Sequence, residues 1–271
     1  MNLEYLQKKA RWVWEETLKI HRRSPETRIA SSLSPIEIFV TLYYGNKVKL
    51  NPKEPFWPER DRCIISKGHG SLCMYPILAD LGYFDASELD KVCKAGSFLG
   101  GIPDPVIPGY ETINGSLGHG LGVASGISLA LKTIGAINKV YVVVGDGELH
   151  EGSNWEAFMF AAQHGLSNLT VIVDNNAICM LGQTDQIVSH IDLKSKLESF
   201  GWYAINAANG HDIKCLLEAF DLLESDSIER PKIIIADTIK GRGVPGLEGA
   251  DLSHVTAISP DHINSLVDGE A

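Results

Sequence analysis

Three runs of apolar residues constrain the fold of this chain more than any other feature of its sequence. They read VYVVV at residues 140–144, LTVIV at residues 169–173 and IIIA at residues 233–236. Strands without an alternating polar face are typical of parallel sheets that are covered on both sides. A helix is expected at residues 154–164, between the first two runs, and the order strand, helix, strand recurs. The sequence therefore predicts an α/β fold, a doubly wound and mostly parallel sheet with helices on both faces.

Length and charge limit what such a chain can do. A length of 271 residues is near the upper limit for a single core, so we expect one domain over residues 1–260. Residues 261–271 are expected to form a frayed C-terminal tail or a linker. A net charge of -10 disfavours nucleic-acid binding, because phosphate contacts need Lys and Arg.

Targeting and redox features point to the cytoplasm. No apolar run reaches the roughly 18 residues that a membrane-spanning helix needs, and the charged start shows no secretion signal. Five cysteines without a CxxC pair suit reduced thiols. We therefore expect a cytoplasmic protein without a nucleic-acid or membrane partner.

Local patterns predict several further elements and one long loop. Helical spacing of apolar residues predicts a helix over the first 20 residues. Ser34 is a suitable cap, and Pro35 a suitable first residue, for a second helix. A short strand is expected at residues 63–66, and a helix follows it. Residues 96–122 are rich in Gly and Pro, and a loop of this length is expected to be functional.

Polar residues directly follow two of the apolar runs, as GDGE at residues 145–148 and DNN at residues 174–176. Because parallel strands end at the same edge of a sheet, Asp146 and Asn176 are expected to lie close together in a ligand-binding crevice. A carboxylate and an amide oxygen suit a magnesium-like cation whose remaining ligands are phosphate oxygens. The helix that starts near Ser153 offers backbone N–H groups to the same phosphates. The alternative is that Asp146 and Asn176 only cap turns.

The spacing of GDG and NN resembles the thiamine diphosphate signature, and the surrounding sequence resembles the transketolase family. The resemblance is carried by GDGELHEGSNWEAFMFAAQHGLSNLTVIVDNN at residues 145–176 and by three further segments. These are DRCIISKGHGSLCMYPILADLGYF at 61–84, NGSLGHGLGVASGISLALK at 114–132 and DTIKGRGV at 237–244. The chain length resembles that of the N-terminal subunit of split transketolases. This resemblance implies the thiamine diphosphate-binding fold, with the diphosphate-binding domain alone.

The resemblance assigns four residues to the metal and the diphosphate. Asp146 through its carboxylate, Asn176 through its side-chain oxygen and Ile178 through its backbone carbonyl would bind Mg²⁺, or Ca²⁺ or Mn²⁺ in its place. The N–H group of Gly147 would contact the diphosphate.

Further residues are expected around the cofactor. Gly115, Ser116 and Leu117 match the stretch that lines the thiazolium side of the cofactor pocket. Gly145 and Glu148 belong to the cofactor-binding turn, although capping a helix is the more ordinary role for Glu148.

Three histidines match active-site positions of the family. His69, in the sequence SKGH, matches a histidine beside the diphosphate and the reactive carbon. His254 matches a second active-site histidine, so both are expected to be catalytic and cofactor-binding. His119 stands where the family usually has Gln, and it either lies near cofactor and substrate or only holds its loop.

The implied activity is transfer of a two-carbon ketol unit from a ketose or ketose phosphate to an aldose. Imidazoles suit the acid–base steps because they titrate near neutral pH. In the family, a glutamate on a pyrimidine-binding domain activates the cofactor, and this chain does not supply that domain. The resemblance therefore implies that the chain is inactive alone and pairs with a C-terminal transketolase subunit, as an α2β2 heterotetramer.

Two positions depart from the family pattern. Arg28 stands where the first substrate loop usually has His, and Ile102 stands where a Gly-His-Pro motif has His. Arg is a permanent cation that binds carboxylate or phosphate through two parallel hydrogen bonds, whereas Ile102 makes its corner of the pocket apolar. Both changes favour a non-standard sugar substrate. The alternative is that the alignment slips here and that His21 replaces the missing histidine.

Two other functions remain open at this point. One is a neighbouring thiamine enzyme, a subunit like deoxyxylulose-phosphate synthase or one that decarboxylates 2-oxo acids. ASSL at residues 30–33 resembles the synthase, whereas KGRG at residues 240–243 favours transketolase. The other is a non-catalytic, cofactor-binding subunit that regulates a partner, which the intact GDG, NN and His69 oppose.

Overall fold

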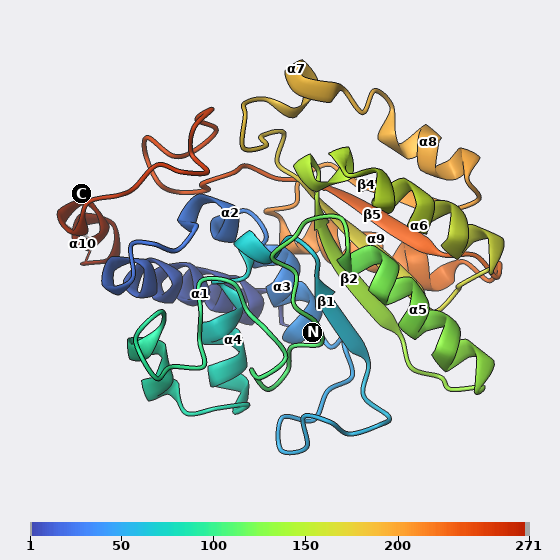
Figure 1. The fold of residues 1–271 in the computed structure, drawn as a ribbon, viewed down its shortest axis with the longest axis horizontal. Coiled ribbons are helices and arrows are strands. Elements are labelled where there is room, and N and C mark those ends of the chain that lie inside the picture. Colours follow the sequence, from blue (N-terminus) through green and yellow to red (C-terminus); the bar gives the residue numbers. More distant parts are fainter. Residues whose placement is uncertain (1, 269–271) are drawn as a thin grey trace.

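The computed structural model describes residues 2–268. Within these residues, parallel strands form one sheet with the order β1-β2-β3-β5-β4 (Figure 1). The strands are β1 (Arg62–Ile65), β2 (Val140–Gly145), β3 (Leu169–Asn175), β4 (Tyr203–Ala207) and β5 (Lys232–Asp237). The three apolar runs form β2, β3 and β5, which are the three central strands.

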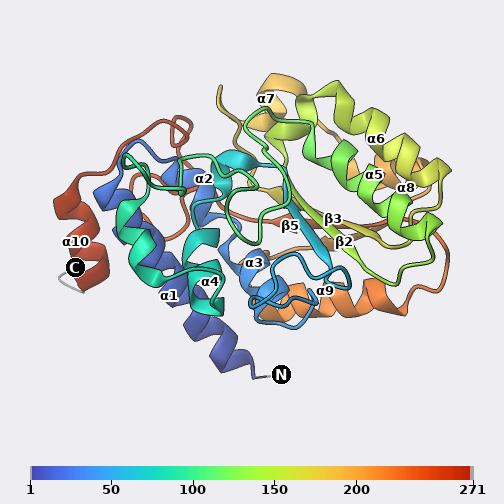
Figure 2. The same cartoon turned by 60° about the horizontal axis from the view of Figure 1, so that its bottom comes forward.

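Helices cover both faces of the sheet because successive strand residues point to opposite sides. In β2, Val142 and Val144 pack with one helical layer, whereas Tyr141 and Val143 pack with the other. Figure 2 shows α5, α6 and α8 together on one side of the sheet and α9 on the opposite side. The predicted doubly wound α/β fold is therefore confirmed. The first layer contains α5 (Gly120–Thr133), α6 (Gly152–Gln163) and α8 (Leu193–Ser199). The second contains α1 (Leu3–Arg23), α3 (Ile36–Tyr43) and α9 (Ile213–Ser225), with α4 (Met74–Leu81) packed against α1 and α3.

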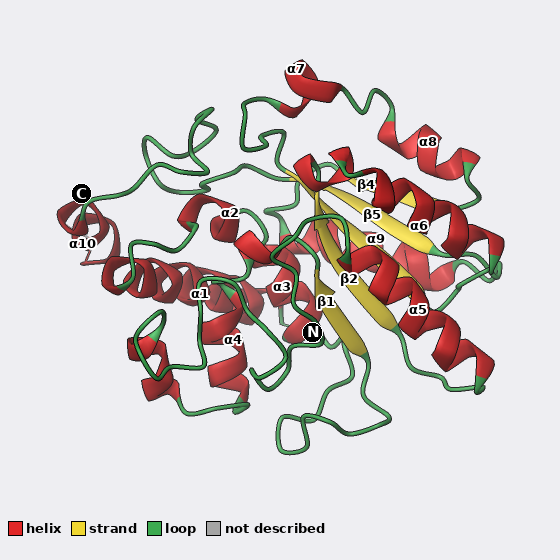
Figure 3. Cartoon of the chain, viewed as in Figure 1, coloured by secondary structure: helices red, strands yellow, loops and turns green. Residues whose placement is uncertain are grey.

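Short helical turns and loops connect these layers. The short elements are α2 (Ile29–Leu33), η1 (Gly68–Gly70), η2 (Ala86–Lys91), η3 (Gly147–His150) and α7 (Thr184–Val188). Residues 92–119, between η2 and α5, contain no helix or strand (Figure 3). This segment contains residues 96–119 of the Gly- and Pro-rich stretch that was expected to form a functional loop, whereas residues 120–122 begin α5.

Two local expectations are wrong. Ser34 does not cap the helix that follows it, because its hydroxyl donates a hydrogen bond to buried Asp174 (2.6 Å). The C-terminal residues are not a frayed tail as far as residue 268, because they form α10 (Pro260–Asp268). This helix packs against α1, where Ile263 is fully buried and the Arg22 guanidinium bonds to Asn264. The expected domain limit at residue 260 coincides with the start of α10, and residues 269–271 lie outside the described chain.

The described residues contain no helix that is both long and apolar enough to cross a membrane. All five cysteines lie in this part of the chain and are unpaired, with Cys63 and Cys73 buried.

Candidate active site

A cavity of about 470 Å³ lies at the carboxyl ends of β1, β2 and β3. Most residues that the sequence predicted for the site line this cavity. They are Arg28, His69, Leu117, Gly145, Asp146, Gly147, Glu148, Asn176, Ile178 and His254. The predicted residues outside the lining are Ile102, Gly115, Ser116 and His119, all in the 92–119 segment.

Asp146 follows β2 directly, and only 2% of its surface is exposed. Its carboxylate accepts a hydrogen bond from the Thr184 hydroxyl (2.7 Å), and its backbone carbonyl accepts one from His190 Nε2 (2.8 Å). Burial raises the pKa of Asp146. A buried carboxylate is costly unless a cation lies beside it. This position is therefore suited to a bound metal ion.

Residues after β3 bring two further oxygen atoms to the same cavity. The Asn176 side-chain oxygen accepts a hydrogen bond from the Ile178 N–H group (3.2 Å), and the Ile178 carbonyl accepts one from the Lys240 ammonium (2.8 Å). Burial, together with the nearby charge of Lys67, lowers the pKa of Lys240 to about 8. One carboxylate, one amide oxygen and one backbone carbonyl are oxygen ligands of the kind that Mg²⁺ accepts. The residues present therefore fit the cation that the resemblance implies.

Asp174 supports this arrangement from beneath. It is fully buried, forms an ion pair with Lys67, and accepts hydrogen bonds from the hydroxyls of Ser34 and Thr238. It also accepts a hydrogen bond from the Asn176 amide (3.3 Å). Burial alone would raise the pKa of Asp174, but the Lys67 ammonium and these donors hold it below its usual value. Asp174 therefore fixes Asn176 relative to the sheet.

Glu148 joins the turn after β2 to the loop before α5. Its buried carboxylate accepts hydrogen bonds from the backbone N–H groups of Gly118 (2.9 Å) and Gly145 (3.2 Å). Gly118 has a φ of 85°, and a Cβ atom there would lie 2.5 Å from the Cβ of Glu151. Glycine is therefore required at this close approach. These contacts give Glu148 a structural part in holding the loop at the cavity.

His69 and His254 lie side by side, with their ring centroids 5.6 Å apart. Nδ1 of His254 shares a hydrogen bond with the Ser31 hydroxyl (3.0 Å). Burial, and then the charges of Arg28 and Lys240, lower the pKa of His69. Burial and the charge of Lys240 lower the pKa of His254 to about 4. Both rings are therefore neutral near pH 7, where an imidazole can accept a proton.

The two departures from the family pattern lie in different places. The exposed Arg28 side chain lines the cavity. Ile102 is 39% exposed and packs beside Gly115, where an added Cβ would be 3.5 Å from the Ile102 Cδ1 atom. His21 is buried at the end of α1, bonds to Thr27 (2.8 Å) and does not line the cavity. The alternative in which His21 replaces the missing histidine is therefore wrong.

His119 is exposed and holds its own loop. Its Nδ1 atom bonds to the backbone carbonyls of Ser116 (3.2 Å) and Leu117 (3.1 Å). Of its two expected roles, these bonds favour the structural one.

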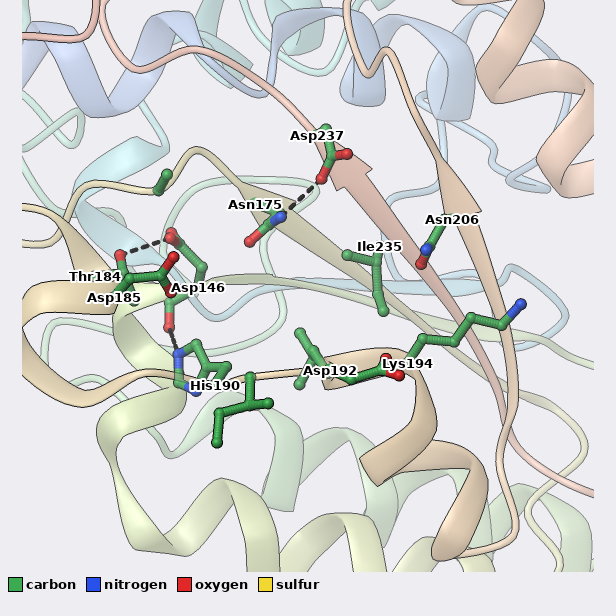
Figure 4. Close-up of a pocket in the computed structure, with 13 residues that line it drawn as sticks. Asp146, Asn175, Thr184, Asp185, His190, Asp192, Lys194, Asn206, Ile235 and Asp237 are labelled. Carbon is green, nitrogen blue, oxygen red and sulfur yellow. Dashed lines mark hydrogen bonds between the residues drawn. The ribbon is translucent and has the colours of Figure 1, made fainter.

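A second cavity of about 310 Å³ lies on the other side of Asp146, toward the ends of β3, β4 and β5. Figure 4 shows Thr184 and His190 bonded to Asp146 at one end of this cavity. It also shows Asn175 bonded to Asp237 (2.7 Å) near the strand ends. The residues between β3 and α8 therefore cover Asp146 and separate the two cavities.

These strand ends, with oxygen atoms that would suit a cation and two neighbouring histidines in one cavity, are typical of cofactor-dependent α/β enzymes. The family model described as "Transketolase, thiamine diphosphate binding domain" matches residues 30–268. The chain belongs to this family. Its cofactor is accordingly thiamine diphosphate.

Named relatives include subunits of split enzymes. An apulose-4-phosphate transketolase subunit of Actinobacillus succinogenes is 38% identical over 252 residues, which are 92% of this chain and 90% of that protein. A 6-deoxy-6-sulfo-D-fructose transketolase subunit of Clostridium sp. is 36% identical, over 83% of this chain and 82% of its own length. The solved transketolase of Campylobacter jejuni superposes with a TM-score of 0.90 and 28% identity. That match covers 100% of this chain but 43% of the solved chain, so this chain spans less than half of a full-length transketolase.

Four residues that line the cavity or bond to a predicted site residue were not predicted from the sequence. Lys67 and Lys240 stand in the quoted SKGH and KGRG segments, where a lysine beside glycines near a strand end was an available signal. Ser31 lies in the short helix α2, three residues after Arg28, which precedes that helix. Thr184 has no local signal, because the bridge between Ile178 and Gln183 brings it back toward Asp146.

Proposed function

We propose that this chain is the thiamine diphosphate-binding subunit of a two-subunit transketolase. The enzyme would transfer a two-carbon ketol unit from a ketose or ketose phosphate to an aldose acceptor. The observation that carries the proposal is the meeting of Asp146, Asn176, His69 and His254 in one cavity at the strand ends. Relatives of nearly the same length that are named as transketolase subunits support it.

The metal would be held by Asp146, Asn176 and the Ile178 carbonyl, with Mg²⁺ as the expected ion and Ca²⁺ or Mn²⁺ as substitutes. Lys240 donates a hydrogen bond to the same carbonyl and lines the cavity, so its charge would lie near the diphosphate. The Gly147 N–H group is a further donor for the diphosphate, as the family resemblance suggests.

Bound thiamine diphosphate supplies a nucleophilic carbon that accepts the ketol unit and passes it on. The chain's own contribution would be proton exchange. Ser31 engages Nδ1 of His254, so Nε2 is the nitrogen left to exchange a proton with a substrate oxygen. His69, also neutral near pH 7, would act on a second oxygen. Leu117 lines the same cavity and would pack on the cofactor ring.

A second polypeptide would complete the active site. The described residues hold one sheet, of the diphosphate-binding type, and the family resemblance places the activating glutamate on a pyrimidine-binding domain. The Actinobacillus relative is itself named as one subunit of its enzyme, which supports such a partner. We propose an α2β2 assembly with a C-terminal transketolase subunit, located in the cytoplasm.

The substrate of this assembly would be a non-standard sugar. Arg28 and Ile102 stand where the family resemblance expects histidines, while Asp146, Asn176 and His69 line the cavity. The two relatives described above carry names with apulose-4-phosphate and 6-deoxy-6-sulfo-D-fructose. These names support a substrate other than the ordinary pentose phosphates.

The test combines the purified chain with its partner subunit, thiamine diphosphate, Mg²⁺ and a ketose phosphate donor. We expect ketol transfer by the pair and none by either polypeptide on its own. The Asp146→Asn variant is the control, and it should bind the partner but lose transfer. Turnover by the chain without its partner would contradict the split enzyme. Cofactor binding without turnover by the pair would favour a regulatory subunit, and preference for pyruvate as donor would favour a synthase-like enzyme.

A further inference from the structure

Arg28 differs from the other cations of the cavity because, within the described residues, its guanidinium makes neither an ion pair nor a hydrogen bond. Lys67 is paired with Asp174, and Lys240 donates to the Ile178 carbonyl. Among residues 2–268, the Arg28 guanidinium bonds to no other group, and only its backbone carbonyl accepts a bond, from Ser32. The side chain is nevertheless part of the cavity wall. Arg28 is therefore free to bind an anion that enters the cavity.

The position of Arg28 shows which part of a ligand it would meet. Arg28 immediately precedes α2, and Ser31 lies within that helix. Ser31 bonds to His254. Among the charges that act on His69, that of Arg28 has the largest effect on its pKa. The Arg28 side chain, His69 and His254 line one cavity, and the helix that follows Arg28 contacts both histidines through Ser31 and Ser32. The guanidinium therefore shares the cavity with the two histidines that would exchange protons with the reacting oxygens.

Resting on the function proposed above, we propose that Arg28 binds a carboxylate of the acceptor substrate, on the carbon next to the reacting carbonyl. A guanidinium matches a carboxylate through two parallel charged hydrogen bonds. An anionic group at the far end of a sugar would be several bonds away from His69 and His254. In place of the aldose of the general reaction, the acceptor would thus be a short aldehyde that carries a carboxylate next to its carbonyl.

The reaction needs no further reagent. Ketol transfer breaks one C–C bond of the donor. The remainder of the donor leaves as an aldehyde, because the hydroxyl on its carbon loses a proton as the bond breaks. Ketol transfer also forms one C–C bond to the acceptor carbonyl carbon, and the acceptor oxygen takes up a proton. The carboxylate is unchanged, and no electrons enter or leave.

The first test compares three acceptors in the complete enzyme with its partner subunit. Glyoxylate carries a carboxylate next to its aldehyde, glycolaldehyde is the neutral match, and glycolaldehyde phosphate carries its anion farther out. We expect kcat/KM to favour glyoxylate over glycolaldehyde by about tenfold or more, as a charged hydrogen-bond pair allows. Arg28→Gln should reduce this preference by about 10- to 100-fold, and Arg28→Lys should retain part of it. Arg11→Gln, on an exposed arginine of α1, is the control.

Two kinetic outcomes would overturn the proposal. One is an equal loss for glyoxylate and glycolaldehyde in Arg28→Gln, which would indicate a structural role. The other is a wild-type preference for glycolaldehyde phosphate over glyoxylate, which would place the anion at the distal end.

A second test does not depend on turnover. The imidazole NMR signals of His69 and His254 are followed in the full chain while sodium glycolate is added. We expect a saturable shift in the wild type and none in Arg28→Gln. An unchanged response in the variant overturns the carboxylate site even if ketol transfer is found. An Arg28-dependent response without ketol transfer supports the carboxylate site and contradicts the proposed function.

Discussion

The cation wall of the main cavity and the side that would face the substrate differ in how firmly their residues are held in place. Asp146, Asn176 and Ile178, which would face the cation, are 2%, 7% and 6% exposed, and each is hydrogen-bonded to a neighbouring residue. On the side that would face the substrate, Arg28 lines the cavity and Ile102 lies outside its lining, and both residues are exposed and lie outside the sheet. The first set directly follows two central strands, whereas the second lies on a helix start and a long loop. Cofactor binding is therefore tied to the fold, while substrate choice can change without disturbing it.

The largest expected effect falls on the cation wall. Asp146→Ala should reduce ketol transfer by the complete enzyme by at least about 1,000-fold, since even indirect partners of metal ligands cost about 10- to 100-fold. Activity is measured across a Mg²⁺ titration. Asp185→Ala, on an exposed residue nearby, is the control and should remain active.

In the metal-free chain, Asp146→Asn should melt at the same or a higher temperature, because burial raises the pKa of this carboxylate. A strongly destabilised metal-free variant would contradict the assigned role.

Beneath that wall, Asp174→Asn should destabilise the chain by about 3–5 kcal/mol, because it leaves the buried Lys67 ammonium without its partner. Denaturant unfolding of the chain alone measures this loss. The double variant Lys67→Met with Asp174→Asn should recover part of it. A double variant as unstable as the sum of the single variants would show that the two residues are not coupled.

His254 lines the same cavity. Its replacement should lower kcat by about 100-fold, which is the lower end of general acid–base effects. His254→Gln also tests whether the imidazole of His254 is uncharged in the folded chain. The pKa of His254 is about 4 in the folded chain and 6.5 for an ordinary histidine, so between these values the unfolded chain binds more protons. Wild-type stability should therefore fall as pH drops from 6.5 to 4, and the fall should be smaller in the variant. Melting temperatures at pH 7 and pH 5 give the comparison, and equal falls would refute the lowered pKa.

On the substrate side, Ile102→His should raise kcat/KM for ordinary ketose phosphates by about tenfold, because it restores the histidine that the family resemblance expects at this position. Stability should change by less than about 0.5 kcal/mol, because Ile102 is 39% exposed. Ile113→His, on a residue of the same loop that is 67% exposed, is the matched control. A gain in both variants would show that position 102 has no special effect.

The smallest expected effect is a difference in stability between two glycine substitutions, one in helix α5 and one in the loop beside the cavity. Gly122→Ala in α5 should stabilise the chain by about 0.5–1 kcal/mol, because an added Cβ meets no atom within 4 Å. Gly118→Ala should instead destabilise it, because its φ of 85° and its contact with Glu151 exclude a side chain. Unfolding of both variants is measured on the chain alone. Similar changes of stability in the two would contradict the tight packing of the loop.

The central strands and the strand-end residues could be predicted because their signals are local. Long apolar runs mark strands buried on both faces, and the polar residues after β2 and β3 follow them directly in sequence. Strand β4 was not predicted, because it lies at the sheet edge and its residues, Tyr203–Ala207, have a mixed burial pattern.

The supporting residues could not be predicted because their partners are distant in sequence. Ser34 looks like a helix cap until Asp174, 140 positions away, is placed beside it. Lys240 reaches Ile178 across 62 positions, and Thr184 reaches Asp146 across 38. The assigned roles of the site residues remain predictions, which the experiments above are designed to test.

The contacts of Asp174 have a consequence for the kinetics of folding. Its partners Ser34, Lys67 and Thr238 are 140, 107 and 64 positions away along the chain. Contacts of such long sequence separation form slowly, because loop closure must precede them. The N-terminal helices and β5 must therefore both dock before Asn176 is fixed. During refolding, the ability to bind the cofactor should thus appear with the slowest phase, well after the helices have formed.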